Sequence, residues 1–244
     1  MLRLKVLLFT AIWISIVQNV QAQSHYNAWF RSTLSVPISS KIKTDAEFQH
    51  RRQNGFENEN MFDRNLMFTL RNWLHYQHNS DLKFSVSPFS YFSHYRVIQH
   101  QSDETAKPSN EIRFSVAAEW QHKLFEKWYI VDRSAVEYRI FNNTQSDISR
   151  FRNRLGVRYD FTEQIKLTVY DEFFVNVTGT SKAHFFDHNR IGFNVEYHVF
   201  PNLKFDIGYI YIVRQPLTTT AKLYENNTFL NLSYQLKKKI KTLN

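Results

Sequence analysis

Apolar and polar side chains alternate along nearly the whole chain after residue 24. The clearest example is residues 150–161, where the polar parity holds Arg150, Arg152, Arg154, Gly156, Arg158 and Asp160, and the other holds Phe151, Leu155, Val157, Tyr159 and Phe161. Successive residues of a strand point to opposite faces, so each strand has one polar and one apolar face. In a soluble sandwich the apolar face meets another sheet, whereas in a membrane barrel it meets lipid and the polar face lines the interior.

The same alternation predicts eleven extended segments. They are residues 25–36, 41–53, 59–77, 81–97, 109–122, 127–141, 149–161, 164–177, 184–199, 202–214 and 226–236. Soluble strands average about 5 to 6 residues, whereas a tilted membrane strand needs about 9 to 11. The lengths therefore favour an all-β chain that forms a single antiparallel transmembrane β-barrel, with residues 23–244 as one domain.

The predicted connections alternate between tight and longer ones. Tight connections fall near residues 37–40, 79–80, 124–126, 162–163 and 201, and longer ones near 54–58, 99–108, 142–148, 178–183 and 215–225. Short periplasmic turns and longer external loops are typical of outer-membrane barrels. This assignment puts the C-terminus in the periplasm but starts segment 25–36 outside. Because bacterial barrels have an even strand number, we expect ten strands if 25–36 does not span, or twelve if one strand is missed.

The N-terminus has the features of an export signal. Arg3 and Lys5 precede an apolar run of 12 residues, 6–17, and Val20-Gln21-Ala22 fits a small-residue cleavage site with Gln23 as the mature start. The run is shorter than the roughly 20 residues of a transmembrane helix. We therefore expect residues 1–22 to be a signal peptide and the mature chain to reach the outer membrane of a Gram-negative bacterium.

The charge and the cysteine content narrow the function classes. The chain has no cysteine, so disulfides and thiolate sites are excluded. Its formal charge is +9, but the signal peptide and the lysine-rich tail after Leu236 carry most of it and leave +3 on the body. No basic stripe with a nucleic-acid motif is present, so we expect no nucleic-acid partner. The tail is interpreted as a solvated periplasmic end.

The apolar parity is consistent with a lipid-facing wall in the second half of the chain. It collects Ile191, Phe193, Val195, Tyr197, Val199, Leu203, Phe205, Ile207, Tyr209, Tyr211, Val213, Leu230, Leu232, Tyr234 and Leu236. Trp120, Trp128, Tyr209, Tyr211 and Tyr234 lie where interfacial aromatic girdles are expected. The alternative is that these aromatics fill the core of a soluble sandwich, because aromatic residues favour strands in any setting.

The opposite parity carries both signs of charge and predicts a polar network in the lumen. Its candidate members are Glu47, Arg51, Arg71, Glu119, Glu137, Arg139, Arg152, Arg154, Arg158, Asp160, Glu172, Arg190 and Glu196, with Asp45, Arg113, Arg133, Lys166, Lys204 and Asp206 on the same face. Buried charges need partners, so a structural ion-pair network is the first interpretation. A selective pore or ligand site is the second, because charged rings in a lumen set selectivity. The excess of arginine would favour anions if the lumen is open.

Enzymatic candidates are few. They are the pair Asp171-Glu172 and a cluster of His184, Asp187, His188, Asn189 and Arg190. On a strand, four residues span about 13 Å, too far for His184 and His188 to bind one zinc. The chain contains no GxSxG or HExxH motif. We therefore expect no catalytic site, cofactor or metal, with an outer-membrane hydrolase of lipid or peptide as one alternative and a secreted soluble β-sandwich that binds a ligand as another.

Three motifs carry a family resemblance. They are RNRLGVRYD at 152–160, DEFFVN at 171–176 and FDHNRIGFNVEY at 186–197, followed by Gly208-Tyr209. With these motifs the chain resembles a bacterial outer-membrane β-barrel family known as domain of unknown function 2490, from Trp29 onward and including 47–51. The resemblance implies an outer-membrane barrel without an assigned activity. Its recurrent polar positions correspond here to Arg152, Arg154, Asp171, Glu172, Asn176, Asp187 and Arg190.

One departure concerns the end of the chain. Outer-membrane barrels usually finish on an aromatic residue that the assembly machinery reads, but here Leu236 stands in that place and a basic tail follows. The expected role is a structural barrel or narrow channel with a charged lumen. Its expected partners are outer-membrane lipid and the barrel assembly machinery, with a small solute or ion as a candidate ligand.

Overall fold

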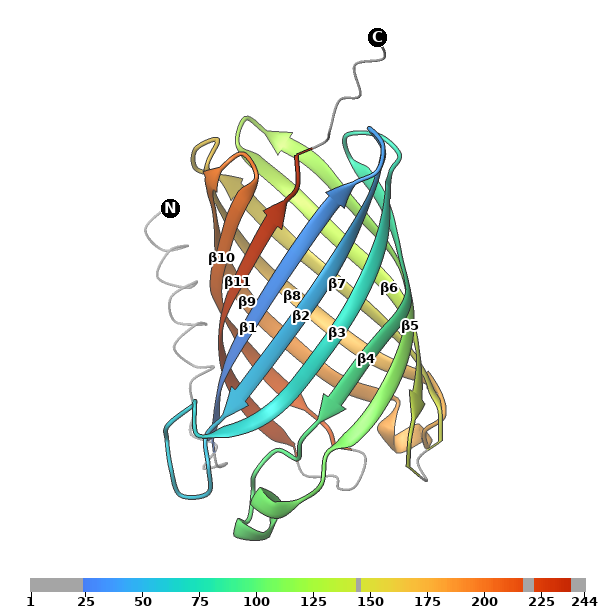
Figure 1. Ribbon diagram of the computed structural model, residues 1–244, viewed down its shortest axis with the longest axis vertical. Helices are drawn as coiled ribbons and strands as arrows, with labels where there is room; N and C mark the ends of the chain where they lie inside the picture. The colour runs from blue at the N-terminus through green and yellow to red at the C-terminus, as the bar shows by residue number, and fades with distance from the viewer. Residues whose placement is uncertain (1–23, 144–145, 217–221, 238–244) are drawn as a thin grey trace, which may run out of the picture.

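Eleven strands pair edge to edge into a closed barrel in the computed structural model, which describes residues 24–143, 146–216 and 222–237 (Figure 1). The strands are β1 (Ser24–Pro37), β2 (Ile42–Gln53), β3 (Arg64–Gln77), β4 (Leu82–His94), β5 (Ser109–Phe125), β6 (Trp128–Phe141), β7 (Ile148–Asp160), β8 (Ile165–Thr178), β9 (Phe186–Phe200), β10 (Leu203–Arg214) and β11 (Leu223–Gln235). Each expected segment corresponds to one strand. The predicted signal peptide, its cleavage site at Ala22 and Gln23, and the tail beyond Lys237 lie outside the described residues.

The connections sort to the two ends of the barrel as the sequence predicts. Residues 38–41, 78–81, 126–127, 161–164 and 201–202 join strands at one end, here called the tight-turn end. Residues 54–63, 95–108, 142–147, 179–185 and 215–222 join them at the other, the long-loop end. The longest loop contains the short helix η1 (Gln101–Thr105), and residues 179–185 contain η2 (Lys182–His184). Strand β11 ends at the tight-turn end, whereas β1 begins at the long-loop end (Figure 1).

The barrel closes with an odd number of strands, and the expectation of an even number is wrong. Strand β1 pairs with β11 in parallel, from Ser24 opposite Tyr224 to Ser35 opposite Gln235. It also pairs antiparallel with β2, so residues 25–36 form a full member of the wall. All other neighbouring strands are antiparallel, which makes the barrel mixed. Eleven strands in sequence order require this, because the first and the last strand then run in the same direction.

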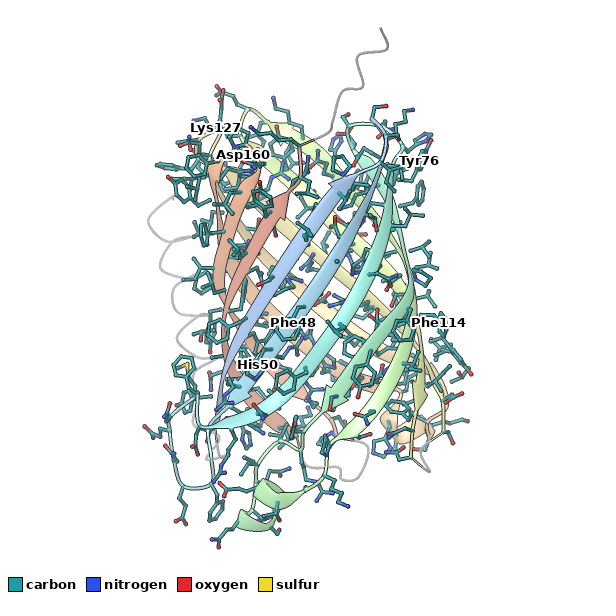
Figure 2. The ribbon with its side chains drawn as sticks, viewed as in Figure 1. Phe48, His50, Tyr76, Phe114, Lys127 and Asp160 are labelled. Carbon is teal, nitrogen blue, oxygen red and sulfur yellow. The ribbon has the colours of Figure 1, made fainter. Side chains whose placement is uncertain are left out.

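The outer wall of the barrel is largely apolar. Exposed aliphatic and aromatic side chains cover it on every strand, among them Phe48, Phe114, Val116 and Ile191. Figure 2 shows Phe114 projecting from the wall and Tyr76 at the tight-turn end. Trp120, Trp128 and Tyr234 are also exposed on this outer face, near the tight turns. Such a surface fits hydrocarbon with an aromatic girdle at its boundary.

A small polar patch interrupts this wall halfway along β6, β7, β8 and β9. On β6 and β7, the amide of Asn153 donates to Asp132 at 2.6 Å and lies 2.9 Å from the Ser134 hydroxyl. On β8 and β9, the amide of Asn189 donates to both carboxylate oxygens of Asp171 at 3.0 Å. The alternation predicts apolar residues at these outward positions. Each carboxylate here has a neighbouring amide that partly satisfies it.

Inside the barrel, apolar and aromatic residues from β1, β8, β10 and β11 form one buried cluster. Trp29, Tyr170, Ile210, Ile212 and Phe229 form this buried cluster. The Tyr170 ring lies directly over Gly192, where a Cβ atom would stand 2.5 Å from the ring carbon Cζ. Only glycine allows this close approach.

No helix among the described residues is long and apolar enough to span a membrane.

Candidate lumenal site

The long-loop half of the lumen is filled by a network of buried ion pairs, here called the ion-pair plug. Its members come from four strands and are Glu111, Arg113, Glu137, Arg139, Arg150 and Asp187. Glu137, which is 2% exposed, lies 2.6 Å from Arg150 and 3.4 Å from Arg113. Glu111 accepts from Arg113 at 2.6 Å and from Arg139 at 2.8 Å. The alternation along β5, β6 and β7 directs five of these side chains inward, and a β-bulge beside Asp187 turns the sixth inward.

Apolar and aromatic residues pack around the plug. Phe174, Ile148 and Ile212 are fully buried there. The His188 ring stacks on Phe174 with centroids 3.8 Å apart, and its Nδ1 lies 3.2 Å from the Asp187 carboxylate. Buried charges that are fully paired in this way are held in one arrangement, because removing any partner leaves another charge without compensation. The plug therefore closes the long-loop half of the lumen in this structure.

The tight-turn half of the lumen is hollow and forms a vestibule. Its cavity has a volume of about 630 Å³. Lys43, Lys83 and Lys204 line it close to the tight turns, and Trp29 and Arg190 line it at mid-barrel. A solute that enters from the tight-turn end therefore passes these lysines, each paired with a carboxylate, before it reaches Arg190.

The lining of the vestibule has a strong excess of cations. Twelve lysines and arginines face six aspartates and glutamates, a difference of six positive charges. The cations are Arg31, Lys43, Arg51, Arg71, Lys83, Arg133, Arg152, Arg154, Arg158, Lys166, Arg190 and Lys204, and the anions are Asp45, Glu47, Glu119, Glu172, Glu196 and Asp206. A concave site lined by one sign of charge concentrates ions of the other sign. The cavity is therefore suited to anions.

Every residue of the predicted polar network points into the lumen. Eleven of the thirteen line the vestibule or bridge to it: Glu47, Arg51, Arg71, Glu119, Arg152, Arg154, Arg158, Asp160, Glu172, Arg190 and Glu196. The other two, Glu137 and Arg139, belong to the plug. Many form ion pairs, such as Arg158 with Asp160 at 2.7 Å and Arg71 with Glu47 at 2.6 Å. The structure thus brings the network together in two regions instead of one.

The prediction missed several charged residues that the plug and its surroundings require. The predicted lumen network does not include Glu111, Arg150, Asp187, Arg214 and Glu225. All five are part of the ion pairing inside the barrel, and Arg214, for example, pairs with the buried Glu225 at 2.7 Å. Strand parity was a usable signal for Glu111 and Arg150, which share a face with Arg113 and Arg152. It failed for Asp187, because a β-bulge between Phe174 and Val175 shifts the register beside it.

The residues considered for hydrolysis are dispersed. Asp171 lies on the outer face with Asn189, whereas Glu172 faces the lumen and contacts Arg152. His184 lies in the loop helix η2, where its ring contacts Ser181, and His188 lies inside the plug. Asp171 and Glu172 are therefore on opposite sides of the wall and do not face one substrate together.

Comparisons with known proteins agree with the barrel. The model of the family described as "Protein of unknown function (DUF2490)" matches residues 26–222. No curated protein matches the chain. Among solved structures, the NanC porin has a TM-score of 0.51 at 11% identity, with 87% of this chain and 99% of that one covered. At this identity the similarity shows a shared barrel fold.

Two longer outer-membrane chains also match in part. OmpT, an outer-membrane protein of Vibrio cholerae, has a TM-score of 0.39 at 10% identity over 79% of this chain and 57% of its own. An anion-selective porin from Comamonas acidovorans has a TM-score of 0.37 at 9% identity over 80% and 53%.

Proposed function

Because the chain belongs to the DUF2490 family, whose members are proteins of unknown function, we propose its role from the lumen: a non-enzymatic outer-membrane barrel that forms a narrow, anion-selective channel. The observation that carries this proposal is the excess of six positive charges around the vestibule. Charged linings of a lumen select ions of the opposite sign.

An outer-membrane location is supported by three features. The outer wall exposes apolar side chains on all sides, the fold is shared with a porin, and the N-terminal sequence has the pattern of an export signal. In this location lipid covers the wall and the barrel assembly machinery inserts the chain. The tight-turn end then faces the periplasm and the long loops face outward, as in other barrels of this kind.

The ion-pair plug makes the channel narrow. It occupies the long-loop half of the lumen with side chains that are nearly all buried, including Glu111 and Glu137 at 1% and 2% exposure. A solute that enters the vestibule has to displace part of this network to pass. The proposed channel therefore conducts weakly, and its conductance rises when the plug is loosened.

Two measurements test this function. A shift in gel mobility between unheated and boiled membrane samples first establishes a closed barrel in the membrane. In planar bilayers under a KCl gradient, the reversal potential is then expected to show a preference for chloride. A cation preference contradicts the proposal. If neither the wild type nor a plug variant such as Glu137→Gln conducts, the channel is excluded and the protein is a structural barrel.

A further inference from the structure

Four buried N–H groups on the floor of the vestibule have no hydrogen-bond partner in the described part of the chain. They are the indole Nε1 of Trp29 and the guanidinium Nε atoms of Arg51, Arg71 and Arg190. All four side chains line the same cavity, although they come from β1, β2, β3 and β9. Buried donors in native proteins are nearly always paired, so four unpaired ones around one cavity indicate a missing acceptor.

Arg51 is the least compensated cation of the group. Within the described residues it forms no salt bridge, and its only hydrogen bond goes from one terminal nitrogen to the Gln49 side chain at 3.0 Å. Its guanidinium carbon lies 3.6 Å from the centre of the Trp29 ring. Arg190, Arg214 and Arg71 repel it, and Glu225 attracts it. This guanidinium therefore has no carboxylate in direct contact within the described residues.

The two neighbouring arginines use only part of their donors. A terminal nitrogen of Arg71 binds Glu47 at 2.6 Å, and a terminal nitrogen of Arg190 lies 3.4 Å from Glu172. The Arg190 guanidinium also lies 5.6 Å from the Trp29 ring, so Arg51 and Arg190 share this one indole. The carboxylates Glu47 and Glu172 thus partly neutralise the floor but leave Arg51 and the three Nε donors unsatisfied.

We propose that the floor of the vestibule, formed by Trp29, Arg51, Arg71 and Arg190, is a binding site for an oxyanion. Water would satisfy the N–H groups but would not compensate the charge of Arg51. An oxyanion does both, because its several oxygens accept charge-assisted hydrogen bonds from guanidinium and indole donors. Carboxylate, phosphate and sulfate groups share this chemistry. The inference rests on the proposed anion-selective lumen and adds to it a saturable site.

Calorimetric titration of the purified barrel in detergent tests the site directly. The probes are sodium sulfate, sodium phosphate and sodium acetate at constant ionic strength, with chloride as the comparison. We expect saturable binding of one anion per barrel by at least one oxyanion and none by chloride over the same range. Binding of both sulfate and phosphate indicates that the natural ligand is an inorganic oxyanion. Binding of acetate alone indicates a carboxylate ligand.

Matched variants separate a defined site from diffuse charge. Arg51→Gln removes the guanidinium that has no salt bridge within the described residues, and we expect it to weaken anion binding at least tenfold. Trp29→Phe removes the indole N–H but keeps a ring beneath Arg51, and we expect it to weaken binding about threefold to tenfold. Arg158→Gln removes the same charge from the vestibule, but this guanidinium is already bound by Asp160 and Gln121. Its effect is expected to be clearly smaller. Equal losses in Arg51→Gln and Arg158→Gln overturn the floor site in favour of diffuse attraction.

The outcomes also distinguish this inference from the channel itself. Titration measures binding without conduction, and the reversal potential measures selectivity without a saturable site. Heat-modifiable gel migration shows which variants are folded, and if Arg51→Gln does not fold, Trp29→Phe and Arg51→Lys carry the test. Chloride binding equal to that of the oxyanions, or no saturable binding by wild type, overturns the proposal even if the bilayer shows anion preference.

Discussion

Thr33 on β1 lies directly opposite Ser233 on β11, in the parallel register that closes the barrel. Both side chains line the vestibule. Parallel pairing is slightly less stable per residue than antiparallel pairing, so this seam is where the odd strand number has its cost. It is also the feature of the wall that separates an eleven-strand barrel from one with an even number of strands.

A disulfide tests the seam. Because the chain has no cysteine, the double variant Thr33→Cys/Ser233→Cys has a single thiol pair. We expect it to oxidise in the folded barrel, since directly paired strand residues place their Cβ atoms within disulfide reach. Non-reducing mass spectrometry after proteolysis detects the bond. The pair Ser35→Cys/Asn231→Cys is four positions out of register and should stay reduced; the reverse result contradicts the parallel pairing.

The plug should be sensitive to the loss of a single carboxylate. Glu137→Gln leaves Arg150 and Arg113 without their shared partner, and we expect it to destabilise the barrel by about 3 to 5 kcal/mol. The temperature at which the gel mobility shifts measures this loss. Glu196→Gln is the matched control near the tight turns, where the partner Lys204 is partly exposed, and it should cost about 0 to 1 kcal/mol. Similar losses in both variants would show that the plug is not specially stabilising.

The outward pair of Asp171 and Asn189 should behave differently from the lumen pairs. Asn189→Leu removes the amide that donates to this carboxylate on the lipid-facing wall, and we expect it to destabilise the barrel by about 1 to 3 kcal/mol. Asp171→Leu/Asn189→Leu replaces both partners and should recover the stability of wild type or exceed it. Urea unfolding in lipid vesicles gives both values. A double variant less stable than the single one would indicate that Asp171 contacts another polar group in the membrane.

The longest loop should lose its order only in acid. Burial acts to raise the pKa of the Asp103 carboxyl, but hydrogen bonds from the backbone N–H groups of Gln99 and His100 and from Arg96 outweigh it, so the pKa lies below its usual value. Such a carboxylate stabilises the loop at pH values above its usual pKa of about 3.9. This stabilisation is lost as the pH falls through the lowered pKa of the folded state. The hydrogen bond from the backbone N–H of Gln99 to the Asp103 carboxylate should therefore persist from neutral pH down to about pH 4, with its amide-proton NMR shift as the readout. Asp103→Asn should change this shift at neutral pH; an unchanged shift there would contradict the role of the carboxylate.

The sequence predicted the wall of the barrel well because a strand has a period of two. Once Arg152 and Arg158 are assigned to one face, Leu155 and Val157 must lie on the other. The eleven strands, the two kinds of connection and the inward position of the predicted network all follow from this local rule. It misplaced Asp187 because a bulge changes the period at one residue, and a bulge is not visible in the alternation.

What the sequence determined by itself is therefore the face on which each side chain lies. The tertiary structure decided which strands meet and at what height the inward charges stand, since these depend on closure and register between segments distant in the chain. Closure pairs β1 with β11 in parallel, and register places Glu137 beside Arg150 in the plug. It leaves Arg51 stacked on Trp29 without a salt bridge to any described residue. The alternation of polar and apolar residues does not predict such contacts, because it describes each strand separately.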